Sequence, residues 1–301
     1  MILRLAAEAM GTRFELVLSG EGQPLLRSAG EAALEAVREE HRRLSVFEPG
    51  SLLSRVNAEA ASRAVPVDQD LFDLLTLCRG VWESSGGAFD PAVGALMRRW
   101  GHRDQPHASD LGAGGGFESV VLDDRAMTVR FAHPSVALDL GAVAKGYALD
   151  RAAEIVRGVG LRAALLHGGT SSIVAIGAPP ECDGWRVGLG GHAGPAAAQL
   201  VLRDVAVSVS APSGRVSASG AGHIMDPRTG APASEADEAV AIGRSGALAD
   251  AWSTALVVLG RRPDTMPPEL GSAVRTGSAW VVSSSMRSTF FRAAARPQSG
   301  V

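Results

Sequence analysis

The sequence has only two cysteines, Cys78 and Cys182, in 301 residues, and they form no CxxC pair. This scarcity argues against a structural zinc site or a disulfide framework. Cys78 lies in an apolar helical stretch, so we expect a buried free thiol, while a single disulfide to Cys182 stays open. Charged residues make up 20% of the chain and the net charge is -3, which gives no electrostatic basis for binding nucleic acid or an anionic membrane.

Long apolar runs are also absent from the chain. None reaches the roughly 18 residues of a membrane span, and Glu8 interrupts the N-terminal stretch where a signal peptide would have its apolar segment. We therefore expect a cytoplasmic protein without a membrane span. A hydrophobic content of 46% supports a substantial core, and we expect one domain over 1–301 with 287–301 as a flexible tail.

The apolar periodicity predicts helices and many short strands. Helices are expected over 26–44, 51–57, 68–84, 90–100, 142–157 and 248–259, with Asp68 and Asp90 as N-caps and Gly260 as a C-cap. Strands are expected over 12–18, 120–131, 136–138, 162–166, 173–176, 185–189, 198–202, 205–209 and 240–242. Runs of strands with interspersed helices favour an α+β fold with antiparallel sheets over a doubly wound parallel sheet.

The segment 138–147, LDLGAVAKGY, predicts a strand that leads into a helix. A helix N-terminus offers backbone N–H groups and the positive end of a dipole, which suits a diphosphate, and Lys145 would add a point charge. The spacing matches neither a P-loop nor GxGxxG. An ordinary strand-to-helix turn with a surface lysine explains the same residues. Tyr147, the only tyrosine of the chain, falls here.

Asp250 and Thr254 lie four residues apart on the last strongly predicted helix, which places a carboxylate and a hydroxyl on one face. Hard oxygen ligands of this kind suit Mg²⁺, which also takes phosphate oxygens and water. The alternative is structural: Asp250 would cap the helix and Thr254 would bond back to a carbonyl.

Two further segments carry candidate site residues: one has polar side chains, and the other has a pair of glycines. In 223–230, HIMDPRTG, a turn surrounds Asp226, and His223 is a candidate general base because an unperturbed histidine titrates near neutral pH. A lone histidine is more often structural, and Arg228 would contact phosphate or only brace the loop. Gly168 and Gly169 let a backbone approach a ligand closely, or form a β-turn.

Taken together and in this order, these motifs resemble those of the ApbE family over about half the chain. The segments 10–12, 45–47, 54–57 and 87–91 resemble further motifs of that family. The resemblance implies a fold like the tunnelling folds, with antiparallel sheets and packed helices. It also implies binding of FAD with Mg²⁺ and transfer of the FMN half of FAD onto a Ser or Thr hydroxyl of an acceptor flavoprotein, such as a redox subunit, with release of AMP.

The resemblance also implies roles for individual residues. Asp250, Thr254 and a backbone carbonyl of Ala144 would hold the metal ion. Phe47 would stack against the isoalloxazine ring, unless it is simply a core residue. His223 and Lys145 would act in catalysis. The residues implied to contact FAD are Met10, Phe47, Asp90, Lys145, Gly168, Gly169, Thr170, His223 and Asp226.

The sequence departs from the family pattern where the flavin and the acceptor would be handled. The usual Thr-Ser-Gly-aromatic string is replaced by residues in 208–215, Gly222 precedes His223 where a second histidine is common, and Thr170 replaces an acidic or amide residue. Two alternatives therefore stay open. One is an Mg²⁺-dependent FAD pyrophosphatase, in which water attacks and FMN and AMP are released. The other is a non-catalytic flavin-binding protein.

Overall fold

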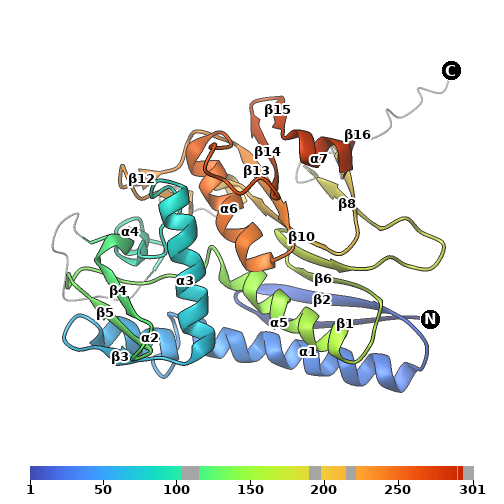
Figure 1. Ribbon diagram of the computed structural model, residues 1–301, viewed down its shortest axis with the longest axis horizontal. Coiled ribbons are helices and arrows are strands. Elements are labelled where there is room, and N and C mark those ends of the chain that lie inside the picture. Colours follow the sequence, from blue (N-terminus) through green and yellow to red (C-terminus); the bar gives the residue numbers. More distant parts are fainter. Residues whose placement is uncertain (104–114, 190–197, 215–221, 290, 294–301) are drawn as a thin grey trace.

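An eight-stranded antiparallel sheet forms the centre of the molecule (Figure 1). The computed structural model describes residues 1–103, 115–189, 198–214, 222–289 and 291–293. The strands run in the order β1-β2-β6-β7-β10-β13-β14-β15. Their bounds are β1 Ile2–Ala9, β2 Thr12–Ser19, β6 Ala163–Gly168, β7 Ser172–Ile176, β10 Val205–Ser210, β13 Glu238–Gly243, β14 Gly271–Thr276 and β15 Ala279–Val282. Every residue of the inner strands β7 and β13 is buried, because both faces of the sheet are covered.

Three helices cover one face of this sheet: α1 (Gln23–Leu44), α5 (Ala144–Gly158) and α6 (Gly246–Leu259). Helix α1 packs on β1, β2 and α5, whereas α6 packs on β10, β13 and α5. The predicted helix ends are confirmed at two places. Asp68 caps α3 (Gln69–Ser84) by accepting the Leu71 N–H, and Gly260 ends α6 in the left-handed conformation with φ 66°.

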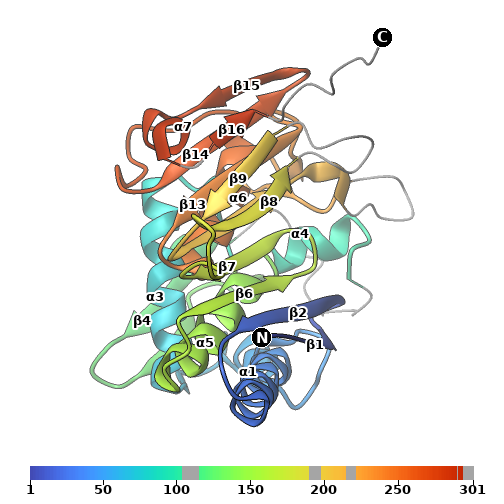
Figure 2. The same ribbon diagram turned by 90° about the vertical axis from the view of Figure 1, so that its right-hand side faces the viewer.

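A small sheet covers part of the other face (Figure 2). It consists of β8 (Trp185–Leu189), β9 (Ala198–Leu202) and β16 (Phe291–Ala293) in the order β16-β9-β8. Leu200 and Leu202 of β9 join Val207, Val240 and other buried residues of the large sheet in one apolar cluster. Regular structure therefore continues past Arg287, through α7 (Ser284–Thr289) and β16; of the predicted tail, residues 290 and 294–301 lie outside the described residues.

The remaining elements are smaller, and most of them lie beside α3, which packs against α6 (Figure 1). They are α2 Leu52–Glu59, α4 Gly94–Arg99, a sheet of β3 Val65–Pro66, β5 Thr128–Phe131 and β4 Val120–Asp123, the pair β11 Met225–Asp226 and β12 Ala231–Pro232, and the 3₁₀ turns Phe117–Ser119 and Pro212–Gly214. The predicted strand over 120–131 is the β4–β5 hairpin. The predicted strand over 136–138 is wrong, because only an isolated bridge joins Ala137 to Val93.

The predicted helix start at Asp90 is also wrong. Helix α4 begins at Gly94, and the Asp90 carboxylate accepts the N–H groups of Ala92 (2.6 Å) and Phe117 (3.1 Å) instead. Asp90 therefore joins two loops that are distant in sequence, which a capping pattern does not reveal. Burial raises the pKa of this carboxyl, while the two backbone N–H groups oppose that rise.

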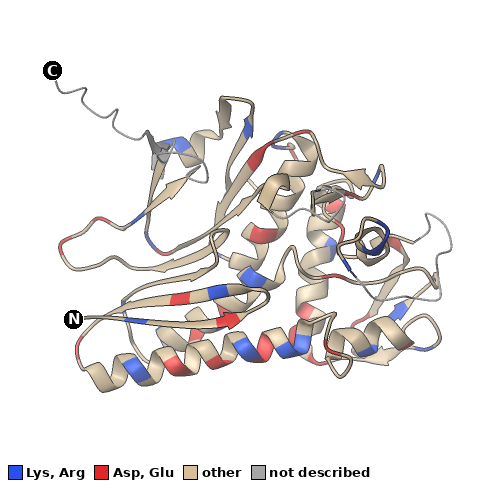
Figure 3. Cartoon of the chain, turned by 180° about the vertical axis from the view of Figure 1, so that it is seen from behind, with Lys and Arg blue, Asp and Glu red and all other residues tan. Residues whose placement is uncertain are grey.

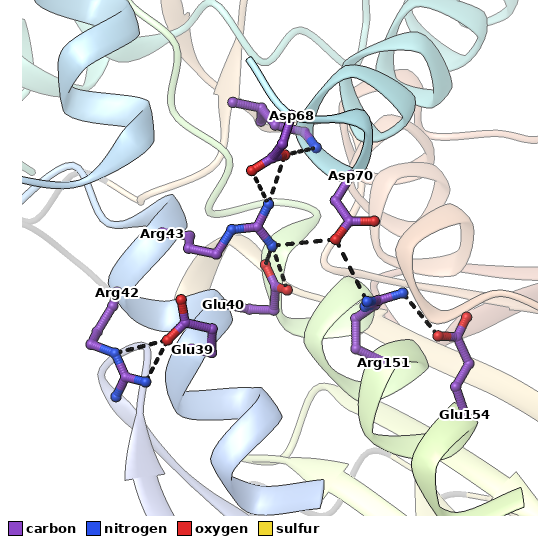
Figure 4. Close-up of polar contacts among 9 residues, drawn as sticks. Glu39, Glu40, Arg42, Arg43, Asp68, Asp70, Arg151 and Glu154 are labelled. Atoms are coloured by element: carbon purple, nitrogen blue, oxygen red, sulfur yellow. Dashed lines mark hydrogen bonds and ion pairs between the residues drawn. The ribbon is translucent and has the colours of Figure 1, made fainter. Parts of the chain in front are cut away.

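An ion-pair network ties α1, α3 and α5 together (Figure 4). Arg43 of α1 contacts Glu40 at 2.7 Å and Asp68 at 2.8 Å, and Arg151 of α5 lies 3.5 Å from Asp70. Tyr147 lies close to this network, and burial together with the charges of Glu40 and Asp70 raises its pKa to about 12. Tyr147 is therefore a neutral phenol at physiological pH.

The architecture confirms the α+β prediction. Charges of both signs are interspersed along α1, the long helix at the bottom of Figure 3, and the exposed ion pairs on it add little to stability. Among the described residues no helix has the length and apolarity to cross a bilayer. Cys78 is a buried free thiol, as predicted, and Cys182 is an exposed one.

Candidate functional site

One large cleft of about 1670 Å³ brings together many of the predicted site residues. This volume exceeds the 300–1,000 Å³ of common small-molecule pockets, so a dinucleotide-sized ligand fits. The predicted residues that line it are Asp90, Lys145, Gly169, Thr170, His223, Asp250 and Thr254. They come from a loop before α4, the start of α5, the β6–β7 turn, the segment before β11, and α6.

The start of α5 lies at this cleft, but most of its backbone donors are already used. The Ala144 N–H donates to the carbonyl oxygen of Leu140 (2.8 Å), and the Gly146 N–H donates to Asp250 Oδ2 (2.7 Å). The Lys145 N–H is the one first-turn donor left without a partner among the described residues. The helix N-terminus therefore offers an anion one backbone N–H together with the ammonium of Lys145.

Asp250 is 3% exposed and is held from two sides. Its Oδ2 accepts the Gly146 N–H from α5, and its Oδ1 accepts the hydroxyl of Ser172 on β7 at 2.8 Å. The N-cap of its own helix is Ser245, so the alternative in which Asp250 caps α6 is wrong. Ser172 escapes sequence analysis because its partner lies 78 residues away.

Thr254 lies one turn after Asp250 on the same helix, within reach of hydroxyl groups from β10. Ser210 Oγ lies 3.4 Å from Thr254 Oγ1 and 2.7 Å from Ser253 Oγ, and Ser253 Oγ lies 3.0 Å from Ser208 Oγ. It is Ser253 that bonds back to the Asp250 carbonyl oxygen, at 2.9 Å. These hydroxyl contacts hold α6 against the sheet and leave Thr254 on the cleft wall.

His223 also lines the cleft, and a Cβ added to Gly214 would lie 3.6 Å from its Cε1. Asp226 lies on β11, where Arg228 contacts its carboxylate with Nη2 at 2.8 Å and Nε at 2.9 Å. Burial acts to raise the pKa of Asp226, but the Arg228 hydrogen bonds outweigh it and hold that pKa below its usual value. Of the two roles considered for Arg228, bracing the loop is the one the geometry shows. The segment 215–221, where part of the departure from the family pattern falls, lies outside the described residues.

Phe47 is not a core residue, because it is 59% exposed. The guanidinium of Arg103 lies 5.0 Å from its ring centroid and contacts Asp139 Oδ2 at 2.6 Å. Arg103 and Asp139 line both the large cleft and a small cavity of about 70 Å³ that includes Phe47. Arg103 carries no local sequence signal, whereas Asp139 ends a recognisable strand-to-helix motif.

Three other predicted residues have structural reasons to be where they are. Met10 (φ 51°) and Gly11 (φ 68°) form the two-residue turn between β1 and β2, and the Met10 N–H donates to His41 Nδ1. Gly168 packs on Phe14, because an added Cβ would lie 2.9 Å from that ring. Gly169 has φ 62° in the β6–β7 turn, so the turn alternative describes this pair, although Gly169 and the exposed Thr170 do face the cleft.

Asn57 connects the N-terminal motif to the segment before α5. Its side-chain amide donates to the Leu138 carbonyl oxygen at 2.9 Å and accepts the Leu138 N–H at 2.7 Å. The Asn57 amide thus satisfies both backbone groups of Leu138, as a neighbouring strand would, and fixes the chain directly before Asp139.

The donor set around Asp250 fits a hard divalent cation that is shared with a phosphate ligand. Among the described residues no three His, Cys, Asp or Glu side chains gather closely enough to hold a metal by themselves. Asp250 has acceptor capacity beyond its two hydrogen bonds, and the Thr254 hydroxyl lies on the same face. One carboxylate with neutral oxygen ligands, phosphate oxygens and water is a common Mg²⁺ environment.

Comparison with known proteins agrees with the motifs. A FAD:protein FMN transferase of Rhodobacter capsulatus is 34% identical over 83% of this chain and 50% of its own length, so the chain spans half of that relative. Another FAD:protein FMN transferase, from Treponema pallidum, is 32% identical over 76% of this chain and 72% of its own.

Solved structures show the same fold. An ApbE protein of Thermotoga maritima is 27% identical with a TM-score of 0.84, over 95% of this chain and 98% of that chain. The flavin transferase ApbE of Vibrio cholerae has a TM-score of 0.78 at 20% identity, over 96% and 99%. The sequence pattern of the ApbE family matches residues 10–266, well over half of the chain, and on this match the chain belongs to the ApbE family.

Proposed function

We propose that this protein is a Mg²⁺-dependent FAD:protein FMN transferase, which moves the FMN half of FAD onto a Ser or Thr hydroxyl of an acceptor flavoprotein and releases AMP. The observation that carries the proposal is the single cleft onto which Lys145, His223, Asp250 and Thr254 converge from three distant segments. The names of the relatives from Rhodobacter capsulatus and Treponema pallidum support it.

In this proposal the diphosphate of FAD lies at the start of α5. The Lys145 N–H and ammonium would bind its oxygens, and their positive charge would stabilise the charge that develops as the diphosphate breaks. Asp250, Thr254 and the Ala144 carbonyl would hold Mg²⁺, which when bound supplies further charge neutralisation. Phe47, Met10, Asp90, Gly168, Gly169, Thr170 and Asp226 are proposed to bind or shape the site for the rest of FAD.

The acceptor hydroxyl oxygen would attack the phosphorus on the FMN side. The bond from that phosphorus to the bridging oxygen breaks, AMP leaves, and a phosphodiester joins FMN to the acceptor. His223 or a nearby carboxylate takes the hydroxyl proton. Most of the rate enhancement would come from positioning and electrostatics, as in other phosphoryl transfers.

The experiment is AMP release from FAD by the full chain, with Mg²⁺ and then with EDTA, and with or without a flavin-free acceptor flavoprotein. The intact mass of the acceptor is measured in parallel. We expect AMP only with Mg²⁺ and acceptor, together with a mass gain of one FMN. AMP and free FMN without acceptor would show the pyrophosphatase instead, and saturable FAD binding without AMP would show a binding protein.

A further inference from the structure

Helices α5 and α6 each cap the N-terminus of the other with a carboxylate. Asp250 of α6 accepts the Gly146 N–H at the start of α5. In return, Asp150 of α5 accepts the N–H groups of Gly246 (2.7 Å) and Ala247 (3.0 Å) and the Ser245 hydroxyl (2.9 Å). Each carboxylate also lies at the positive end of the dipole of the helix that it caps.

The polar contacts matter because they join the first turn of α6 to α5 at fixed backbone groups. Eleven of the 14 residues of α6 are buried, and most of these are apolar. On α5 the contact with α6 is made at Gly146, whose backbone meets that of Gly246, and at Asp150. Burial of apolar side chains is non-directional, whereas hydrogen bonds from fixed N–H groups are satisfied in only one register. Asp150 supplies three such bonds at the first turn of α6.

This first turn is directly coupled to the proposed metal ligands. Asp250 lies four residues after Gly246, about one helical turn, and Thr254 lies one turn further. A helix moves as a rigid body over so short a length, so a shift of its N-terminus displaces the carboxylate and the hydroxyl together. Binding sites for small cations tolerate displacements of only about 0.5 Å.

We propose that Asp150 is a positioning residue for the metal centre: by capping α6 it fixes the register of α6 on α5 and so places Asp250 and Thr254 for the cation. Asp150 does not line the cleft, so it acts through α6 and not by contact with FAD. The inference rests on the proposed function, because the cation belongs to that function.

The test compares Asp150→Ala and Asp150→Asn with a matched control, Asp68→Ala. Asp68 also caps a helix, α3, by accepting the Leu71 N–H at 2.9 Å, but it lies away from the cleft. Binding of Mn²⁺, used as a probe for Mg²⁺, is followed by loss of the free-ion EPR signal in the presence of FAD, with FAD alone as the blank. Circular dichroism at the same temperature verifies that each variant is folded.

We expect Asp150→Ala to bind Mn²⁺ about 10- to 100-fold more weakly, the range found when supporting residues of metal sites are removed. Asp150→Asn keeps one acceptor oxygen and should fall between Asp150→Ala and the unsubstituted protein. Asp68→Ala removes a cap worth roughly 1 kcal/mol and the ion pair with Arg43, so it should lower Tm. It should leave Mn²⁺ affinity within about twofold, because Asp68 lies outside the cleft.

Mn²⁺ binding by Asp150→Ala as tight as that of the unsubstituted protein would overturn the proposal and leave Asp150 as a cap only. If Asp150→Ala does not fold, unchanged affinity in Asp150→Asn is the overturning result. AMP release is measured on the same samples to separate the two hypotheses. Weakened Mn²⁺ binding in the variants supports the positioning role even if the unsubstituted protein forms no AMP, whereas no Mn²⁺ binding by the unsubstituted protein overturns both proposals.

Discussion

The backbones of Gly146 and Gly246 meet where α5 and α6 cross. A Cβ added to Gly146 would lie 2.0 Å from the Gly246 carbonyl oxygen, and one added to Gly246 would lie 2.6 Å from the Gly146 carbonyl oxygen. Only glycine fits at both positions, and the contact brings the N-termini of the two helices close enough for the reciprocal capping by Asp150 and Asp250.

Gly146→Ala should therefore destabilise the fold. The methyl group meets backbone, which cannot move aside as a flexible side chain can, so we expect a loss of about 1–3 kcal/mol or more in the free energy of unfolding by urea. The matched control is Gly80→Ala in the middle of α3, where an added Cβ meets nothing within 4 Å. That variant should gain about 0.5–1 kcal/mol. Equal stability of the two variants would contradict the close contact.

Asp250→Ala should abolish Mg²⁺-dependent AMP release from FAD, because it removes the one carboxylate proposed for the cation. Ser172→Ala, which removes only the hydroxyl that donates to Asp250, should raise the Mg²⁺ concentration for half-maximal rate by about 10-fold or more. Ser272→Ala is the control, since Ser272 is a buried strand serine outside the cleft. Normal turnover by a folded Asp250→Ala protein would show that Asp250 is not a ligand of the cation.

Lys145 can be probed without any substitution, because it is the only lysine of the chain. An acylating reagent has two amines to modify, Lys145 Nζ and the α-amino group of Met1, which is exposed. If the Lys145 ammonium binds the diphosphate, FAD with Mg²⁺ should slow acylation of Lys145 by about tenfold or more. A tenfold decrease in rate corresponds to a contact of about 1.4 kcal/mol.

The Met1 amine is an internal control for that experiment, and peptide mass spectrometry reports both sites on one molecule. Its rate should not change with FAD. Equal rates at Lys145 with and without FAD would remove Lys145 from the binding site.

How much of this site can be predicted from sequence depends on how far apart the interacting residues lie. Asp68 and Gly260 act on their own helix ends, and their local patterns predict both caps correctly. Asp90 has the same local pattern but bonds to Phe117, 27 residues away, so the predicted helix start is wrong. The tertiary contact with Phe117 overrides the local preference of Asp90 for a helix N-cap.

The contacts within the candidate site are still longer in range. The Gly146–Asp250 bond joins residues 104 apart, and the Arg103–Asp139 pair joins residues 36 apart. The sequence predicts which residue types the chemistry needs at Lys145 and Asp250. It does not reveal that Asp250 already accepts two hydrogen bonds, because that depends on how α5, α6 and β7 pack.

Phe47→Ala should weaken FAD binding with little effect on stability. The ring is 59% exposed, so its removal should change the free energy of unfolding by no more than about 0.5 kcal/mol. A stacked flavin would lose about 0.5–1.5 kcal/mol, which corresponds to roughly a two- to tenfold rise in Kd. Quenching of flavin fluorescence measures that Kd. Val281→Ala, at a residue 75% exposed, is the control, and an unchanged Kd for Phe47→Ala would place the isoalloxazine elsewhere.

The Asp226–Arg228 pair predicts a defined dependence of stability on pH. The folded-state pKa of Asp226 lies below its usual 3.8, so its charged form stabilises the folded state above that pH. The contribution is lost as pH falls through the folded pKa. Asp226→Asn should lower the free energy of unfolding by about 1 kcal/mol between pH 6 and 8, a low value because the Arg228 side chain is 40% exposed.

Urea unfolding of both proteins between pH 3 and pH 8 measures this difference. The gap between Asp226→Asn and the unsubstituted protein should stay constant above about pH 5 and narrow below pH 4, as the unsubstituted carboxylate takes up its proton. Arg228→Met removes the guanidinium but keeps the backbone N–H groups that also lower the Asp226 pKa, so that pKa should rise toward its usual value. The same comparison with Asp226→Asn, made in the Arg228→Met protein, should therefore narrow less below pH 4. If the difference in free energy of unfolding between Asp226→Asn and the unsubstituted protein stays the same down to pH 3, the introduced amide disturbs packing. The ion pair would then contribute no pH-dependent stability.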